Sequence, residues 1–281
     1  MSLDAPVRVT GREVLESVLA DSGMNVAHTN LRDVRTHAPR FFEQLRRGEP
    51  NIVVIGADRV ESLDVMSLRW MFPAGITPLV LCPSNPQECA ELAEAAISAA
   101  TLIPGPVFLL LEDAVGDAED IVIAHEAPEL ELVEPAPGDL LDVPQDEGEL
   151  RMLDARLRSG FKGLEPAILD PCPENLGKPE WLLVSFGSST VPGRLAVESA
   201  RNEGQRVNHL SLRQLWPLPE NALMRAVMGI KHIVVAERNL GQYATEVRRF
   251  APDITVIPAG GISQVTPDAI LARLQRTPRC C

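Results

Sequence analysis

Two polar segments in the C-terminal third carry the side chains best suited to ligand binding. The first, residues 187–190, reads Gly-Ser-Ser-Thr; it follows an apolar run and precedes a helical pattern. Backbone amides at such a junction can hold an anion, because the N-terminus of a helix carries partial positive charge. The alternative is a closed turn that caps the helix, and the spacing leaves both interpretations open.

The second segment, residues 237–242, reads Glu-Arg-Asn-Leu-Gly-Gln and begins where an apolar strand pattern ends. In open α/β sheets, ligands bind beyond the carboxyl ends of the strands. The two amide side chains there can bond a ligand or a partner's backbone. The alternative is structural, with Asn239 as a helix N-cap, Glu237 and Arg238 as a local pair, and Gly241 for close packing. The predicted interface or ligand-loop residues are Gly187, Ser188, Ser189, Glu237, Arg238, Asn239, Gly241 and Gln242.

The other polar residues show no pattern that assigns a catalytic residue. Asp33 lies between His28 and His37, a set that could move a proton on an acidic substrate, but ordinary surface or core histidines explain them as well. Ser188 with His209 and an Asp could be imagined as a triad, yet no Gly-x-Ser-x-Gly elbow supports it.

The five cysteines have no Cys-x-x-Cys spacing, so we expect no iron–sulfur, zinc or other metal site on this chain. The Cys280–Cys281 pair could be a redox or metal handle, or two free thiols. The chain shows no signal peptide and no apolar run long enough to cross a membrane. We therefore expect a cytoplasmic protein without a membrane partner.

Composition limits the function further. A net charge of −13 repels phosphate backbones and argues against nucleic-acid binding. Aromatic residues make up only 4% of the chain, so the core must rest on Val, Leu, Ile and Ala. That composition suits buried parallel strands covered by Ala-rich helices.

The N-terminal part alternates helical and strand patterns, which predicts a βαβ arrangement in residues 1–115. Ser84 or Asn85 is expected to cap a helix in which Pro86 occupies the first turn. The predicted helices are 11–22, 38–46 and 87–100, and the predicted strands are 24–28, 51–57, 76–82 and 106–112.

Residues 116–178 are rich in acids and prolines and predict a linker or an arm that lies across the protein or a partner, with one strand at 121–124 and a helix at 149–159. A second domain, residues 179–281, follows. Its predicted strands are 181–186, 207–212, 232–237 and 254–257, and its predicted helices are 192–202, 220–227, 241–250 and 267–275. The fold class is therefore α/β, with two doubly wound, mostly parallel sheet domains.

The order of WLLVSFGSST, LRQLWPLPENAL and KHIVVAERNLGQYATEVRRF resembles the alpha subunit of the 2-oxoacid:ferredoxin oxidoreductases of the pyruvate or 2-oxoglutarate type. In that family these segments form a domain similar to the transketolase C-terminal domain. GREVLESVLADSG and ITPLVLCPSNPQECAELAEAAISAATLIPGPVFLLLEDAVG resemble its pyrimidine-type thiamine domain, here shortened.

The chain departs from the family at two sites. Where the family has Tyr-Pro-Ile-Thr-Pro, residues 30–34 read Asn-Leu-Arg-Asp-Val, so the Thr beside the thiamine is absent. Residues 46–50 leave no room for the family's Gln-Ala-Glu-Asp-Glu segment, one of whose glutamates bonds the aminopyrimidine ring. The Gly-Asp-Gly diphosphate motif, which the family carries on its beta subunit, is also absent.

The resemblance implies an alpha-type subunit of a complex that oxidatively decarboxylates a 2-oxoacid with coenzyme A and ferredoxin. Without its own catalytic Glu and Thr, the chain is not expected to be active alone. Thiamine diphosphate, Mg²⁺ and an iron–sulfur cluster would come through a beta-type partner subunit, giving a hetero-oligomer, with a homodimer as the other possibility. The alternative function is a non-catalytic scaffold or regulatory paralogue that binds a beta-type subunit. Which 2-oxoacid is used stays open.

Overall fold

The computed structural model describes residues 6–72, 76–103, 105–123, 125–132, 146–238, 240–259 and 265–275. The chain forms two units. Unit 1 comprises residues 1–59, 67–165 and 214–218, and unit 2 comprises residues 60–66, 166–213 and 219–281. Each unit therefore contains a short segment from the other half of the sequence.

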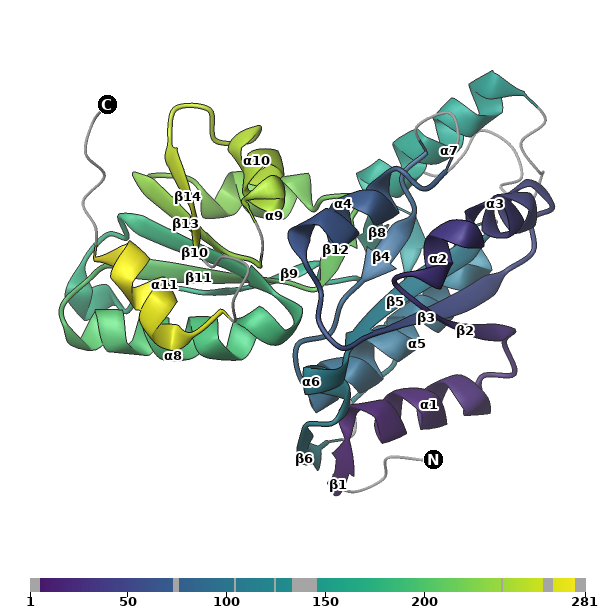
Figure 1. Ribbon diagram of the computed structural model, residues 1–281, viewed down its shortest axis with the longest axis horizontal. Coiled ribbons are helices and arrows are strands. Elements are labelled where there is room, and N and C mark those ends of the chain that lie inside the picture. Colours follow the sequence, from purple (N-terminus) through teal and green to yellow (C-terminus); the bar gives the residue numbers. More distant parts are fainter. Residues whose placement is uncertain are drawn as a thin grey trace. The chain divides into compact units, whose positions relative to one another are not determined.

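Unit 1 is built on a five-stranded sheet in the order β12-β4-β5-β3-β2 (Figure 1). Its strands are β2 (Val26–Asn30), β3 (Asn51–Ala57), β4 (Leu79–Leu81), β5 (Pro106–Glu112) and β12 (Gln214–Trp216). Four strands run parallel, and β12 pairs antiparallel with β4. β3, β4 and β5 consist almost entirely of buried residues, as expected for strands covered on both faces.

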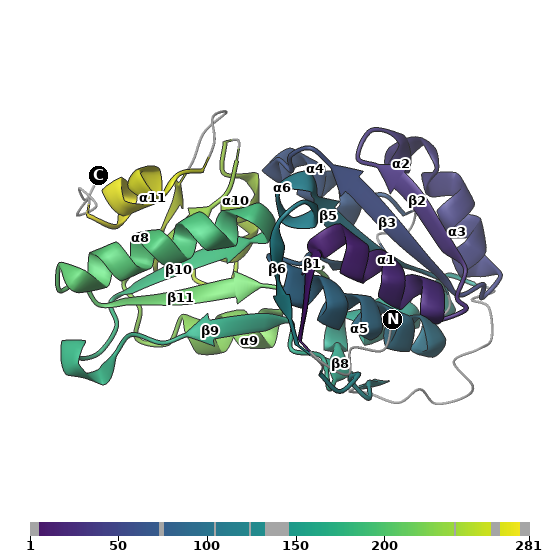
Figure 2. The same cartoon turned by 90° about the horizontal axis from the view of Figure 1, so that it is seen from below.

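Helices lie on both faces of this sheet, with α1 and α5 on one side and α2 and α3 on the other (Figures 1 and 2). The helices of unit 1 are α1 (Gly11–Asp21), α2 (Asp33–Thr36), α3 (Ala38–Arg46), α5 (Pro86–Leu102), α6 (Asp113–Gly116) and α7 (Glu147–Ser159). A further helix, α4 (Ser62–Arg69), begins in unit 2 and ends in unit 1. Asn85 caps α5 by accepting the N–H of Glu88, and Pro86 occupies the first turn, as predicted.

Residues 119–123 and 125–128 of the acidic segment lie along α5. β6 (Glu119–Val122) pairs antiparallel with β1 (Val7–Thr10), and β7 (Glu131–Leu132) pairs with β8 (Phe161–Lys162). The Gln87 amide accepts the N–H of Ile123 and donates to its carbonyl, while Nε2 of His125 lies 2.8 Å from Oε2 of Glu94. Polar side chains of one helix face therefore hold this segment against unit 1.

Unit 2 has a second five-stranded sheet, in the order β14-β13-β10-β11-β9. Its strands are β9 (Ala167–Asp170), β10 (Trp181–Phe186), β11 (Val207–Leu212), β13 (His232–Ala236) and β14 (Thr255–Ala259). β10, β11, β13 and β14 run parallel, and β9 pairs antiparallel with β11.

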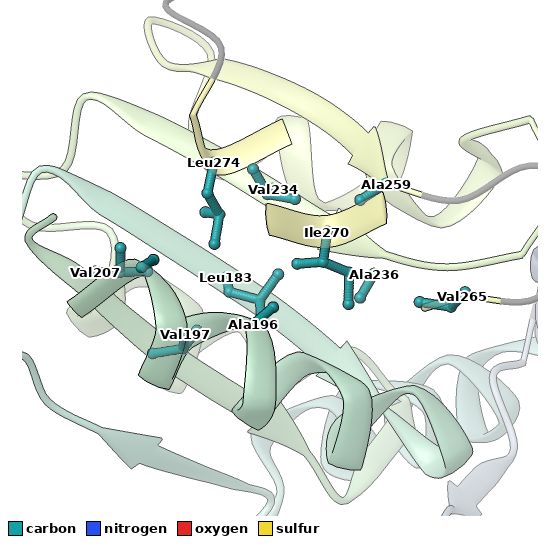
Figure 3. Close-up of a cluster of buried hydrophobic side chains, with 11 residues drawn as sticks. Leu183, Ala196, Val197, Val207, Val234, Ala236, Ala259, Val265, Ile270 and Leu274 are labelled. Atoms are coloured by element: carbon teal, nitrogen blue, oxygen red, sulfur yellow. The ribbon is translucent and has the colours of Figure 1, made fainter. Parts of the chain in front are cut away.

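The helices of unit 2 are α8 (Thr190–Asn202), α9 (Glu220–Ala226), α10 (Gln242–Arg248) and α11 (Pro267–Leu274), with 3-10 turns at η2 (Glu174–Leu176) and η3 (Gly187–Ser189). Figure 3 shows the core between α8, α11 and the sheet, where Leu183 and Val234 meet Ala196 and Ile270. All four side chains are fully buried. Small alanines on α8 let this helix approach the strands closely.

The predicted fold class is confirmed, since each sheet has four parallel strands and helices on its faces. The limits at residues 115 and 178 stay a prediction; residues 116–165 of the predicted arm belong to unit 1 and residues 166–178 to unit 2. Two predicted elements were too broad by more than one residue: β4 spans only Leu79–Leu81, and α10 only Gln242–Arg248. No helix in the described ranges is long and apolar enough to span a membrane.

Candidate functional site

The first predicted loop is a closed turn between β10 and α8. Ser189 is buried, and its Oγ accepts the N–H of Phe186 at 3.1 Å and donates to the carbonyl of the same residue at 2.7 Å. Gly187 has φ of 50°, a left-handed conformation that favours glycine. The structure therefore shows the geometry of a turn here, and anion binding by Gly187, Ser188 and Ser189 stays a prediction.

A largely buried chain of polar side chains links β10, β11 and the start of α8 next to this turn. Nε2 of His209 on β11 is 2.7 Å from Oγ of Ser185 on β10. Ser185 Oγ donates in turn to Thr190 Oγ1 at 3.2 Å, which lies 3.3 Å from Ser211 Oγ. Gly193 makes room for the imidazole, because a Cβ at that position would lie 3.3 Å from Nε2.

The pKa of His209 is lowered to about 4, mainly by burial; Asp170 opposes this shift, and the positive charges of Arg201 and Arg194 add to it. The ring is therefore neutral near pH 7. The histidine pairs with Ser185, not with Ser188, and both members of the pair are buried. This network holds two parallel strands and the start of α8 together, and it offers no exposed nucleophile.

The second predicted loop begins at Glu237, whose side chain is only 1% exposed. Its two carboxylate oxygens accept the N–H groups of Tyr243 and Ala244, each at 2.9 Å. Burial raises the pKa of Glu237, against the lowering effect of these two N–H groups and of Ser62. Glu237 thus binds the first turn of α10 and forms no local pair with Arg238 in the described contacts.

Ser62, which the sequence analysis missed, completes this loop. Its Oγ lies 2.6 Å from Oε1 of Gln242 and 2.8 Å from the carbonyl of Arg238, to which its N–H also donates. Gln242 also accepts the N–H of Leu240. No local signal marks Ser62, because it lies 176 residues before Arg238 in the chain.

The N-cap prediction for α10 is wrong. Gly241, with φ of 89°, occupies the N-cap position of this helix, one residue before Gln242. Gly241 does permit close packing, since a Cβ there would lie 3.1 Å from Cγ of Pro258. Asn239 lies outside the described residues, as does the Cys280–Cys281 pair.

The histidines of unit 1 do not form a site with Asp33. His28 is largely exposed and lies 3.5 Å from Glu16, whereas His37 packs edge-on against Phe41. Asp33 instead accepts the side-chain amide of Asn30, whose carbonyl oxygen accepts the N–H groups of Arg32 and Asp33. The polar groups of this turn therefore satisfy one another.

Two of the described thiols, those of Cys82 and Cys89, are buried and poorly reactive. Burial raises the pKa of Cys82 well above its usual value and that of Cys89 to about 12. Within the ranges that the structure describes, no three His, Cys, Asp or Glu side chains gather closely enough to hold a metal ion.

Comparison with known proteins places the two loops in a recognised domain. Residues 179–269 match the family model of the pyruvate:ferredoxin oxidoreductase core domain II. The 2-oxoglutarate synthase subunit KorA of Methanothermobacter marburgensis is 25% identical over 85% of this chain and 74% of that protein. The subunit of the same name from Methanocaldococcus jannaschii is 26% identical over 76% of this chain and 66% of that protein.

Two solved structures share the fold. A 2-oxoglutarate:ferredoxin oxidoreductase from Magnetococcus marinus, bound to 2-oxoglutarate, coenzyme A and succinyl-CoA, is 14% identical with a TM-score of 0.73; the match covers 96% of this chain and 65% of that chain. A split gene transketolase, an inactive beta4 tetramer, is 14% identical with a TM-score of 0.56. That match covers 95% of this chain and 81% of the transketolase chain. Our chain thus spans about two thirds of the length of the oxidoreductase chain, and it has the transketolase-like fold that its sequence predicts.

Proposed function

This chain is related to the alpha subunits of the 2-oxoacid:ferredoxin oxidoreductases, and we propose that it serves as the alpha-type subunit of such a complex. The proposed reaction is the oxidative decarboxylation of a 2-oxoacid with coenzyme A and ferredoxin. One observation carries the proposal: similarity to a named alpha subunit extends over 85% of the chain, far beyond the matched domain. The names of the relatives favour 2-oxoglutarate as the substrate.

The two loops are proposed to serve packing against a partner subunit. Their buried polar groups are bonded within unit 2, which leaves only their outer residues for other contacts. Leu240, in the second loop, is 78% exposed, more than any other large apolar side chain in the described ranges. This side chain is therefore available for a contact with a partner subunit.

The described residues of this chain do not by themselves fit thiamine diphosphate and its metal ion. The diphosphate needs a cation held by oxygen ligands, and the described residues offer no such cluster. The Asn30–Asp33 turn, which stands where the family keeps its Thr, uses its polar groups internally. We therefore propose that a beta-type partner supplies thiamine diphosphate, Mg²⁺ and the iron–sulfur cluster, in the cytoplasm.

Purification of the tagged chain from its own cells tests the proposal. We expect a stoichiometric second subunit that carries thiamine diphosphate, magnesium, iron and sulfide. The eluate should reduce ferredoxin only when 2-oxoglutarate and coenzyme A are both present, and pyruvate serves as the comparison substrate. A chain that elutes alone and without cofactors, even after crosslinking in the cells, would contradict this function.

The second candidate is a non-catalytic scaffold or regulatory paralogue that holds a beta-type subunit. The Asn30–Asp33 turn favours this candidate, because its polar groups are hydrogen-bonded to one another and it offers no hydroxyl to a cofactor. A stable complex that binds thiamine diphosphate but reduces no ferredoxin with either oxoacid is the result expected for this candidate.

A further inference from the structure

The two edges of the unit 2 sheet differ in how they are protected. The strand at one edge, β14, contains Pro258, which has no backbone N–H and is typical of a protected edge. The strand at the other edge, β9, has the sequence Ala-Ile-Leu-Asp and contains no proline, lysine or glycine. In the described ranges β9 pairs with β11 alone, so its outer side is an open edge.

The hydrogen-bonding groups on that outer side belong to Ala167 and Leu169. The carbonyl of Pro166 accepts the N–H of Arg213, so residue 166 bonds toward β11. Backbone groups alternate in direction along an antiparallel strand, and Ala167 and Leu169 stand opposite Leu212 and Leu210 in non-bonded positions. Their N–H and C=O groups therefore point away from the sheet.

The side chains of the same strand are apolar and exposed. Ile168 is 37% exposed and Leu169 is 43% exposed. Because side chains alternate along a strand, the two lie on opposite faces of the sheet. An added strand would cover apolar surface on both faces as well as satisfy the backbone.

The distribution of charge between the two units favours a second copy of unit 2 as the partner of this edge. Unit 1 holds twenty-seven acidic and thirteen basic side chains, whereas unit 2 holds twelve acidic and thirteen basic ones. A contact between two copies of unit 2 is therefore not opposed by the net charge of that unit, unlike a contact between two copies of unit 1. The carboxylate of β9, Asp170, is already paired with Arg201 at 2.9 Å.

We propose that β9 pairs antiparallel with β9 of a second copy of this chain across a two-fold axis, joining the two sheets. The register places Ile168 opposite Ile168 of the second copy at the axis. Ala167 and Leu169 then face each other in two hydrogen-bonded pairs, which use the outward backbone groups. Pro171 ends the ladder, because it has no N–H to donate. Such a contact is isologous, as expected of a symmetric dimer.

Site-directed crosslinking tests this register in the full-length chain. The background carries Cys172→Ser, Cys280→Ser and Cys281→Ser, so that no native thiol outside the core reacts. In it, Ile168→Cys is expected to give a covalent dimer on mild oxidation, since facing residues in a non-hydrogen-bonded pair are about 4.5 Å apart, within the range of a disulfide. Leu169→Cys is the matched control; it faces Ala167 of the other copy and is expected to stay monomeric on a non-reducing gel.

Sedimentation of the unoxidised chain gives a second test. The wild-type dimer is expected to strengthen as salt rises from roughly 0.03 M to roughly 0.3 M, because screening weakens repulsion between the negative chains. Ile168→Lys places like charges at the axis and should raise the dissociation constant at least about tenfold, whereas Met224→Lys, an equally charged change on exposed α9, should not.

Three results would overturn the proposal. The first is a wild-type chain that stays monomeric at all concentrations and salt levels, and the second is an Ile168→Lys chain that dimerises like the wild type. The third is a Leu169→Cys chain that crosslinks as well as the Ile168→Cys chain does. None of these results depends on oxoacid oxidation. The proposed function can therefore fail while this contact holds, and this contact can fail while the proposed function holds.

Discussion

On acidification from about pH 7 to about pH 4, the wild-type chain should lose about 3 kcal/mol more of its free energy of unfolding than the His209→Gln variant does. In the unfolded chain the ring titrates near its ordinary pKa of 6.5, whereas burial lowers the pKa to about 4 in the folded chain. Because the folded pKa is the lower one, the contribution is fully present above pH 6.5. It is lost as the pH falls through 6.5 toward 4, since the unfolded chain then binds the proton more readily.

Urea unfolding at several pH values between about 7 and 4 measures this effect. Other groups also titrate in that range, so the quantity of interest is the difference between the wild type and His209→Gln. The matched control is His28→Gln, because the His28 side chain is 53% exposed. His28→Gln should retain the steep acid loss of the wild type. If His209→Gln loses as much stability on acidification as the wild type, the buried neutral imidazole is not the cause.

Replacing Glu237 with alanine should lower the free energy of unfolding by about 3 kcal/mol near neutral pH. The substitution leaves the buried N–H groups of Tyr243 and Ala244 without an acceptor and frees the first turn of α10. An unsatisfied buried donor costs about 1–3 kcal/mol. Burial raises the pKa of Glu237, which means that the ionised carboxylate is itself costly to bury. The loss should therefore fall short of the full cost of two orphaned donors.

Glu237→Gln provides a graded comparison. Its single carbonyl oxygen can accept one of the two N–H groups, so we expect about half the loss of the alanine variant. The matched control is Glu220→Gln on α9, where the side chain is exposed and the expected change is below about 0.5 kcal/mol. Equal unfolding midpoints for the wild type and Glu237→Ala in urea would show that α10 does not depend on this carboxylate.

The strands that the sequence predicted with the correct limits are mostly buried, and three of the four are largely apolar, whereas Val207–Leu212 also carries the buried polar residues Asn208, His209 and Ser211. Asn51–Ala57, Pro106–Glu112, Trp181–Phe186 and Val207–Leu212 match the predicted ranges. Their pattern is local, because a strand covered on both faces is mainly apolar, and its few buried polar side chains bond to one another or to the neighbouring elements. Helix Ala38–Arg46 also matched, since its apolar residues recur at helical spacing.

The elements that were missed are short and rest on distant partners. β9 is mostly exposed and lies between two prolines, so no local pattern distinguishes it from a loop; its pairing with β11 alone makes it a strand. β12 is only three residues long and pairs with β4, more than a hundred residues away in the chain. Loop-like sequences can be held as strands when a remote partner supplies the hydrogen bonds.

The sequence by itself determined the fold class, the family resemblance and the position of both candidate loops after strands. These properties follow from apolar periodicity and from short motifs, which are contiguous in the chain. Only the tertiary structure decided which polar groups meet. His209 bonds Ser185 rather than Ser188, and Ser62 bonds a loop 176 residues away. A buried polar group must find a partner wherever the fold brings one within hydrogen-bond distance, and sequence spacing carries no information about that distance.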